Sequence, residues 1–234
     1  MTTTSLREHS SHAYEAELAA VRRKILEMGR QVDEVLEESG RALIQHDVEL
    51  ANSIILKDEL TDDMELDIDH LCLEVLARRQ PVAGDLRLLT SALKLVVDLE
   101  RIGDLGVSIA VRVVELANAA PIVPYDEMLV MLKSARDMVS EALAALMTGD
   151  VERANRVIEM DDRLDAAYAH IFNQVITRMR DTSVDITNAT RVQAVSKYIE
   201  RIGDHATNLA ERVIFVLTGE DVRHLPRARR TDLS

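Results

Sequence analysis

The chain has 234 residues, enough for one large domain or two of about 100 residues each. It carries 41 acidic and 28 basic residues, and the resulting net charge of −13 excludes nucleic acid and anionic lipid as expected partners. Its single cysteine, Cys72, excludes an internal disulfide framework and fits a reducing compartment. Because the sequence shows neither a signal peptide nor a membrane-spanning stretch, we expect a cytoplasmic protein without a transmembrane segment.

The pattern of apolar residues predicts an all-α protein. Aromatic residues make up only 3% of the chain, and apolar residues recur every three or four positions almost throughout. One stripe of this kind is formed by Leu89, Ala92, Val96, Leu99, Gly103, Gly106, Ala110 and Val113. Such a seam is typical of long helices that pack against one another.

Short polar or proline-containing segments divide the chain into helices. The main linker is expected at 118–127, which contains two prolines. Candidate N-caps are Asp85, Asp150 and Asp185, with a similar role for the pair at 46–47. These breaks predict six helices, at about 7–46, 48–79, 85–117, 126–147, 151–179 and 186–218.

The chain contains an internal repeat. Glu-Arg-Ile-Gly-Asp occurs at 100–104 and again at 200–204, and residues 46–58 align with 149–161. The offset changes from 103 to 100, which we interpret as a loss of about three residues between the second and third helices of the second unit. The sequence thus predicts two tandem three-helix bundles, at 1–120 and 121–220, followed by a basic, flexible tail at 221–234.

Acidic side chains lie four residues apart in the repeated segments, which places them on one helix face. The four pairs are Asp58 and Asp62, Glu100 and Asp104, Asp161 and Asp165, and Glu200 and Asp204. Each such pair costs roughly 0.2–0.5 kcal/mol in an isolated helix, so a counter-charge is expected. Carboxylates are hard ligands, and they favour Mg²⁺, Mn²⁺, Ca²⁺ or iron over zinc.

Two readings without a metal remain open. Arg101 and Arg201 follow the glutamates directly and could supply the counter-charge. About seven acidic pairs at this spacing are expected by chance in so acidic a chain, so the pairs alone do not establish a site. A metal-free acidic helical interaction module is therefore the structural alternative. Gly103 and Gly203, in the middle of predicted helices, are expected to permit close helix packing.

Three segments carry a resemblance to a known family. RRQPVAGDLR at 78–87, DLERIGD at 98–104 and YIERIGDHATNLAE at 198–211 resemble the PhoU family of phosphate-uptake regulators. The resemblance implies two tandem three-helix bundles whose E/D-x-x-x-D motifs, here the four acidic pairs, hold multinuclear metal clusters. Ser108 stands where the second unit has Asn208, so the two sites need not be equal.

The same resemblance implies a biological role. It predicts a cytoplasmic regulator, often a homodimer, that damps the phosphate-starvation response. Its implied partners are the ATPase subunit of a phosphate ABC transporter and a sensor histidine kinase.

Enzymatic readings find less support in the residues. Residues 161–165 match the D-D-x-x-D motif of all-α prenyl-diphosphate enzymes, which hold Mg²⁺, but the aligned residues 58–63 lack the leading doublet. A ferritin-like di-iron site needs Glu-x-x-His, which the chain does not contain. His70, His170 and His205 are expected at the surface or in packing. With no nucleophile and base at the required spacing, a non-enzymatic adaptor is the expected class.

Overall fold

The computed structural model describes residues 3–223, and this part of the chain is helical with no strand. Its seven helices are α1 (Thr3–Gln45), α2 (Val48–Ile55), α3 (Glu59–Arg78), α4 (Ala83–Leu116), α5 (Tyr125–Thr148), α6 (Val151–Arg178) and α7 (Ile186–Thr218). The all-α prediction is confirmed. Of the predicted tail at 221–234, the residues from 224 onward lie outside the described part of the chain.

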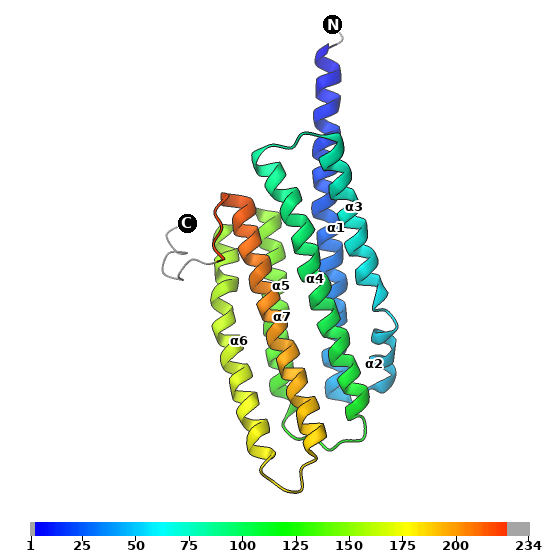
Figure 1. Ribbon diagram of the computed structural model, residues 1–234, viewed down its shortest axis with the longest axis vertical. Helices are drawn as coiled ribbons and strands as arrows, with labels where there is room; N and C mark the ends of the chain where they lie inside the picture. Colours follow the sequence, from blue (N-terminus) through cyan, green and yellow to red (C-terminus); the bar gives the residue numbers. More distant parts are fainter. Residues whose placement is uncertain (1–2, 224–234) are drawn as a thin grey trace.

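The helices form two bundles that lie side by side with their long axes aligned (Figure 1). The first contains α1, α2, α3 and α4, and the second contains α5, α6 and α7. Helix α4 packs on α7 and α1 packs on α5, so each bundle meets the other through two helices. Buried apolar side chains from both bundles form one continuous cluster, and the two copies of the repeat therefore share a core.

Three predicted N-caps are confirmed. Asp47 accepts a hydrogen bond from the backbone N–H of Leu50 at 2.9 Å, and Asp150 accepts one from Arg153 at 2.9 Å. Asp185 likewise caps the first turn of α7. Each carboxylate satisfies a backbone donor that the helix itself leaves unpaired, which explains why the chain turns at these points.

The prediction that Asp85 caps a helix is wrong. Helix α4 begins two residues earlier, after Val82, which makes no capping hydrogen bond through its side chain. The Asp85 carboxylate instead accepts a hydrogen bond from the Tyr14 hydroxyl at 3.0 Å, which ties the start of α4 to α1. The hydrogen bond with Tyr14, a distant residue, therefore replaces the backbone cap that the local sequence predicted for Asp85.

The predicted helix at 48–79 is broken in the structure. Helices α2 and α3 have 8 and 20 residues, together as many as the 28 of the continuous helix α6. The three residues of the break, 56–58, are therefore the extra residues of the first unit. The predicted position of the length difference, between the second and third helices, is wrong. After the break the two units correspond at an offset of 100.

The predicted seam on α4 is confirmed, because all eight of its residues are buried. Gly103 lies against Thr61 of α3, and a Cβ added there would be 3.2 Å from the threonine methyl carbon. A Cβ added at Gly203 would overlap the Cδ2 atom of Leu164, which is only 1% exposed. Both glycines thus bring the second and third helices of their bundles close together.

Replacing Gly203 with alanine should destabilise the protein, although alanine favours a helix by about 1 kcal/mol. The new methyl group must displace a buried leucine, and overpacking of this kind costs about 1–3 kcal/mol. Gly103→Ala, where the neighbour gives way by a few tenths of an ångström, should be close to neutral. Urea denaturation of both variants measures the difference, and equal midpoints would contradict this account of the packing.

Candidate cation sites on the acidic helix faces

Three carboxylates converge in the first bundle. Asp62 of α3 and Glu100 and Asp104 of α4 each offer an oxygen, and these oxygens lie within 4.8 Å of one another. Asp62 is exposed, whereas the side chain of Glu100 retains only 13% of its exposure. Asp58 stands at the N-cap of α3, makes no capping bond through its side chain, and lies close enough to Asp104 to feel its charge. The two predicted pairs of this bundle therefore share one surface.

The crowding of negative charge alters the acidity of this cluster. Burial, together with the charges of Asp104, Glu65 and Asp62, raises the pKa of Glu100 to about 7, against the opposing effect of Arg101. Burial and the charge of Asp104 also raise the pKa of Asp58. Burial is the largest cause of both raised pKa values, and the neighbouring carboxylates add to it.

The expectation for Arg101 is confirmed. Its Nε lies 3.3 Å from Glu100 Oε2 and its Nη1 lies 3.3 Å from Asp104 Oδ2. The arginine side chain is 55% exposed, so solvent weakens both ion pairs. One exposed guanidinium thus pairs with two carboxylates of α4 and forms no ion pair with the described residues of α3.

Two further acidic residues of the cluster were missed in the sequence. Burial and the charges of Asp69 and Asp62 raise the pKa of Glu65, and the Oδ1 atom of Asp69 is buried with no hydrogen-bond partner in the described part of the chain. Glu65 and Asp69 are four residues apart and themselves form an E-x-x-x-D motif. The sequence alignment kept an offset of 103 through the whole predicted helix at 48–79. The offset changes to 100 at residues 56–58, so Glu65 and Asp69 were not matched with the second unit.

The second bundle has a built-in cation instead. Lys197 Nζ donates a hydrogen bond to Glu200 Oε1 at 2.6 Å, and it also lies 5.3 Å from the centre of the Tyr168 ring. The lysine has no counterpart in the first bundle, where Val97 stands at the equivalent position. No ion pair of Arg201 occurs among residues 3–223, so the prediction that this arginine supplies the counter-charge is wrong.

The remaining predicted carboxylates surround this ion pair. Asp165 and Glu200 raise the pKa of Asp204, although burial is the larger cause. The Oδ1 atom of Asp161 would lie 3.7 Å from a Cβ added at Gly203, so this side chain faces α7. Among the described residues, no three carboxylates of the second bundle come as close together as Asp62, Glu100 and Asp104 do in the first. The acidic faces of the two bundles therefore differ, although Asn208, the counterpart of Ser108, contacts Asp98 rather than these carboxylates.

A buried carboxylate joins the bundles beside these faces. Asp98 of α4 is 5% exposed, and its oxygens lie 2.9 Å from Arg212 Nε and 3.0 Å from His205 Nδ1, both on α7. Asn208 adds a contact at 3.4 Å, and the hydrogen bonds from His205 and Arg212 outweigh burial and lower the pKa of Asp98. His205 therefore has a structural partner, whereas His70 and His170 are exposed as expected.

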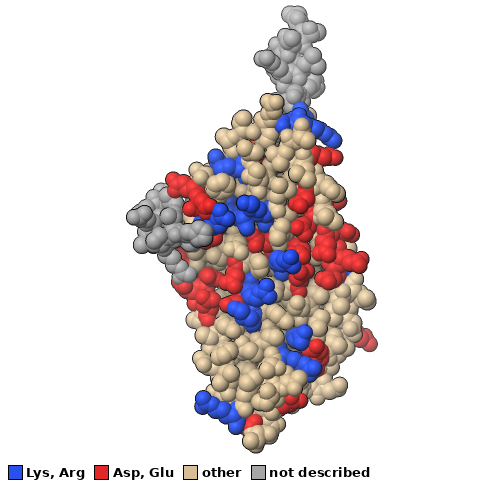
Figure 2. Space-filling view, in the orientation of Figure 1, with Lys and Arg blue, Asp and Glu red and all other residues tan. Residues whose placement is uncertain are grey.

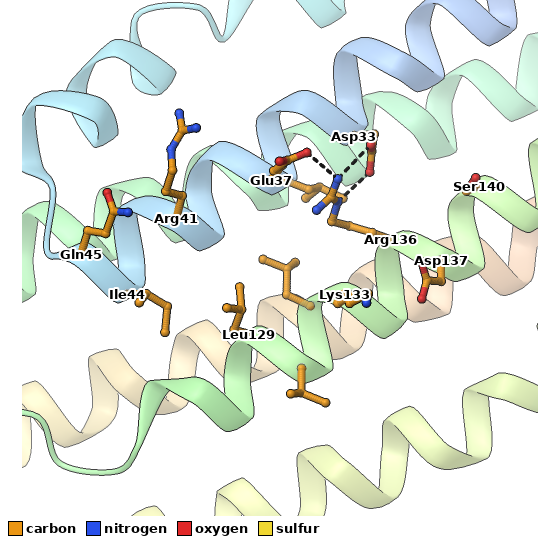
Figure 3. Close-up of a pocket in the computed structure, with 13 residues that line it drawn as sticks. Asp33, Glu37, Arg41, Ile44, Gln45, Leu129, Lys133, Arg136, Asp137 and Ser140 are labelled. Atoms are coloured by element: carbon orange, nitrogen blue, oxygen red, sulfur yellow. Dashed lines mark hydrogen bonds and ion pairs between the residues drawn. The ribbon is translucent and has the colours of Figure 1, made fainter.

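Asp and Glu side chains gather over α3 on the right of Figure 2 and over α6 on the left, with basic side chains between them. The acidic faces of the two bundles therefore lie on opposite flanks of the shared α4–α7 contact. Oxygen ligands in this arrangement suit hard cations, which retain some of their water when bound at an open surface.

Comparison with known proteins identifies the family. A family model described as the PhoU domain matches residues 25–113 and again residues 128–213. The chain belongs to the PhoU family. Its two matched segments are the two bundles, so each unit of the repeat is one PhoU domain.

Named relatives match the PhoU-family chain over most of its length. It is 38% identical over 228 residues to the phosphate-specific transport system accessory protein PhoU homolog of Pseudomonas putida, covering 97% of this chain and 89% of that protein. The Pseudomonas aeruginosa homolog is 37% identical over 226 residues, covering 96% and 93%.

Solved structures show the same fold. The crystal structure of PhoU from Pseudomonas aeruginosa matches with a TM-score of 0.84 at 36% identity, covering 88% of this chain and 100% of that one. The phosphate transport system regulatory protein PhoU from Streptococcus pneumoniae matches with a TM-score of 0.84 at 28% identity, covering 89% and 99%. The predicted family and tandem-bundle fold are thus confirmed.

Replacing Glu100 with glutamine should make stability less dependent on pH. Because the native pKa of about 7 exceeds the ordinary value near 4.3, native Glu100 holds its proton between these values while the unfolded chain releases it. Wild-type stability is therefore lost as pH rises through this window. At pH 8 the variant should be the more stable by about 1 kcal/mol, allowing for solvent screening, and near pH 4 the two should agree.

Urea denaturation without divalent cations measures this effect. Glu200→Gln is the matched control, because its carboxylate already has Lys197 as a partner and should gain nothing from neutralisation. An equal gain in both variants, or none in Glu100→Gln, would contradict the unequal charge balance of the two sites.

Proposed function

We propose that this protein is a cytoplasmic regulator of phosphate uptake that acts as an adaptor, without catalytic turnover, and represses the phosphate-starvation response. Membership of the PhoU family across both bundles carries the proposal, and the relatives named above are accessory proteins of a phosphate transport system. The proposed partners are the ATPase subunit of a phosphate ABC transporter and a sensor histidine kinase. We also expect a homodimer.

The structure is compatible with this location and class. No helix among residues 3–223 is long and apolar enough to cross a membrane. Cys72 is fully buried, and burial raises the pKa of its thiol to about 12, so it is a core residue rather than a nucleophile. His205, beside Asp204, is held by Asp98 in the contact between the bundles. Both residues therefore have structural roles in the described chain.

Cation binding is the second part of the proposal. The first bundle fits a hard cation because it combines three converging carboxylates, a Glu100 pKa raised to about 7, and the unpartnered, buried oxygen of Asp69. Asp62, Glu100 and Asp104 would hold the ion, with Glu65 and Asp69 close by. Such an ion would supply fixed positive charge that stabilises the α3–α4 contact.

The second bundle has a weaker claim to a cation. Lys197 already neutralises Glu200 and lies over the ring of Tyr168, whereas the first bundle has Val97 at the position of the lysine. We therefore propose a principal cation site on α3 and α4. A weaker site would be formed by Asp161, Asp165, Glu200 and Asp204.

Adding Mg²⁺, Mn²⁺, Ca²⁺ or Fe³⁺ to metal-free protein should raise Tm. An ion at a hundredfold excess over its Kd stabilises the native state by about 2.7 kcal/mol, or about 5–10 °C for a chain of this size. Combined Asp62→Asn, Glu100→Gln and Asp104→Asn substitutions should remove the shift. The matched triple variant of Asp165, Glu200 and Asp204 should retain most of it.

Scanning calorimetry of protein purified without nickel resin tests this, with a chelator as the control. A Tm independent of all four ions would overturn the cation site. It would leave Arg101 as the counter-charge and favour the alternative, a metal-free acidic helical interaction module.

Deleting the gene should leave the phosphate-starvation genes expressed in phosphate-rich medium. A transcriptional reporter and phosphate uptake measure this, and the wild-type gene should restore repression. Unchanged repression in a strain that lacks any paralogue would count against the regulatory role, whatever the calorimetry shows.

A further inference from the structure

The acidic surface of the second bundle carries more negative charge than its lysine compensates. This second acidic face comprises Asp161, Asp162, Asp165, Glu200 and Asp204. Lys197 pairs with Glu200 and so compensates one of these carboxylates. Arg163 and Arg201 belong to the same two helices, but neither forms an ion pair within residues 3–223. Further positive charge would therefore be stabilised on this face.

A basic segment of the same chain follows the last described residue. Arg227, Arg229 and Arg230 place three positive charges within four residues, in a chain whose net charge is −13. These arginines lie outside the described part of the chain, and neither the regulatory role nor the cation sites proposed above use them. Arginine donates hydrogen bonds to carboxylates in a bidentate geometry, so the segment has the chemistry that an acidic face selects.

The described residues that precede this segment place its start beside α6 and α7. A Cβ added at Gly149, just before α6, would lie 3.9 Å from Leu217 of α7, so the start of α6 adjoins the end of α7. Val222 is only 1% exposed and is thus packed on the bundle. Arg223 lines a small cavity of about 100 Å³ together with Glu211 of α7. The chain has therefore turned back along α7 by Arg223.

The distances allow the segment to reach the second acidic face. Asp204 is seven residues from Glu211 along α7, or about 10 Å. An extended chain covers about 3.3–3.6 Å per residue, so the three arginines can lie up to about 13–25 Å from Arg223. Asp161 lies against Gly203, which puts Asp162 and Asp204 at the same height on the bundle. Carboxylates of both helices are thus within reach.

We propose that the basic segment of Arg227, Arg229 and Arg230 docks on the second acidic face of its own chain and pairs there with Asp162, Asp165 and Asp204. The segment is then an internal counter-charge for this face. A cation or a basic segment of another protein reaches the weaker cation site only in competition with it. The contact joins two parts of one chain, so it depends neither on the regulatory role nor on cation binding.

The acidic face of the first bundle is the other surface that could attract this segment. It lies on the opposite flank of the molecule, beyond the basic side chains between the two acidic groups (Figure 2). Helix α4, which lies between them, carries the exposed residues Lys94 and Arg101. The route to the first bundle crosses both α7 and α4 and passes these like charges. Charge and distance therefore both favour the second bundle.

Quenching of bimane fluorescence by tryptophan measures the contact in the full chain. The protein has no tryptophan, and its one thiol, Cys72, is fully buried, so Ala228→Cys adds a single reactive thiol among the arginines. Ala166→Trp puts the quencher on the second acidic face, four residues after Asp162. Leu66→Trp is the matched control, because Leu66 is 56% exposed and lies at the equivalent position of the first bundle.

About half of the bimane fluorescence should be lost in the Ala166→Trp variant at low salt with a chelator present. A short tether gives a millimolar effective concentration, which is close to the affinity of a few exposed ion pairs. The Leu66→Trp variant should keep its full fluorescence. About 0.5 M NaCl should restore the fluorescence of the Ala166→Trp variant, because the Debye length then falls below about 5 Å.

Exchange of charges tests which residues pair. Combined Arg227→Glu, Arg229→Glu and Arg230→Glu substitutions should abolish quenching in the Ala166→Trp variant. Adding Asp162→Arg and Asp165→Arg to that protein should restore it, because the attraction returns with its signs reversed. Both aspartates are exposed, so the Tm should show that the bundle remains folded.

The proposal fails on any of three results. One is an Ala166→Trp variant without salt-sensitive quenching. Another is equal quenching in the Ala166→Trp and Leu66→Trp variants, or quenching that survives reversal of the three arginines. The last is quenching of labelled protein without tryptophan by unlabelled Ala166→Trp protein, which would make the contact one between copies of the chain. With a chelator present, none of these results bears on cation binding or on repression.

Discussion

The close approach of two helices at a glycine is the constraint on which the acidic faces depend. In each copy of Glu-Arg-Ile-Gly-Asp the glycine lies between the two carboxylates and faces the preceding helix of its bundle. Removing a side chain at this point lets the helices meet, and it brings their carboxylates within reach of one another. The pentapeptide is therefore one structural unit, because its packing residue and its charged residues require each other.

The negative charge of crowded carboxylates must be compensated, and the two bundles compensate it with different residues. The first bundle uses an exposed arginine from the same helix and adds acidic residues on α3, so its charge stays unbalanced. The second uses Lys197, held over Tyr168, and has fewer acidic neighbours. Duplication preserved the backbone arrangement while the surrounding side chains diverged. A repeated motif thus establishes a repeated fold, but it does not establish two equivalent sites.

Much of the fold follows from local sequence. Apolar spacing located the long helices, and Asp47, Asp150 and Asp185 cap helices because the donors they satisfy are only two or three residues away. The seam of α4 was predictable for the same reason, since its buried residues follow helical spacing. In each case the deciding interaction lies within one helix or one turn.

The errors have both distant and local causes. The Asp85 side chain accepts a hydrogen bond from Tyr14, 71 positions away, instead of capping its own helix. Lys197, rather than Arg201, reaches Glu200, because the position one turn earlier on α7 points at the carboxylate. The break at 56–58 was hidden because its residues carry neither proline nor glycine, and only the mismatch in helix length reveals it. Asp69 was not predicted as part of the acidic cluster, because the sequence alignment did not include the change of offset at this break.

The contact between bundles raises a different problem, that of burying a charge. Asp98 is almost inaccessible to water, and removing one of its α7 partners would leave a buried carboxylate short of compensation, which costs several kcal/mol. The arginine, histidine and asparagine around it come from one face of α7 and give the contact a defined register. Apolar packing alone would tolerate sliding of α4 along α7 more readily.

Helix α4 also packs closely on α1, within the first bundle. Gly106 of α4, two residues after Asp104, lies against Val35 and Leu36 of α1, and a Cβ added there would be 2.8 Å from Val35 Cγ1. Leu36 is fully buried. A close-packed core transmits small displacements because it has no space to absorb them. The position of α4 is therefore fixed by close packing against α1 on one side and by the buried Asp98 ion pair with α7 on the other.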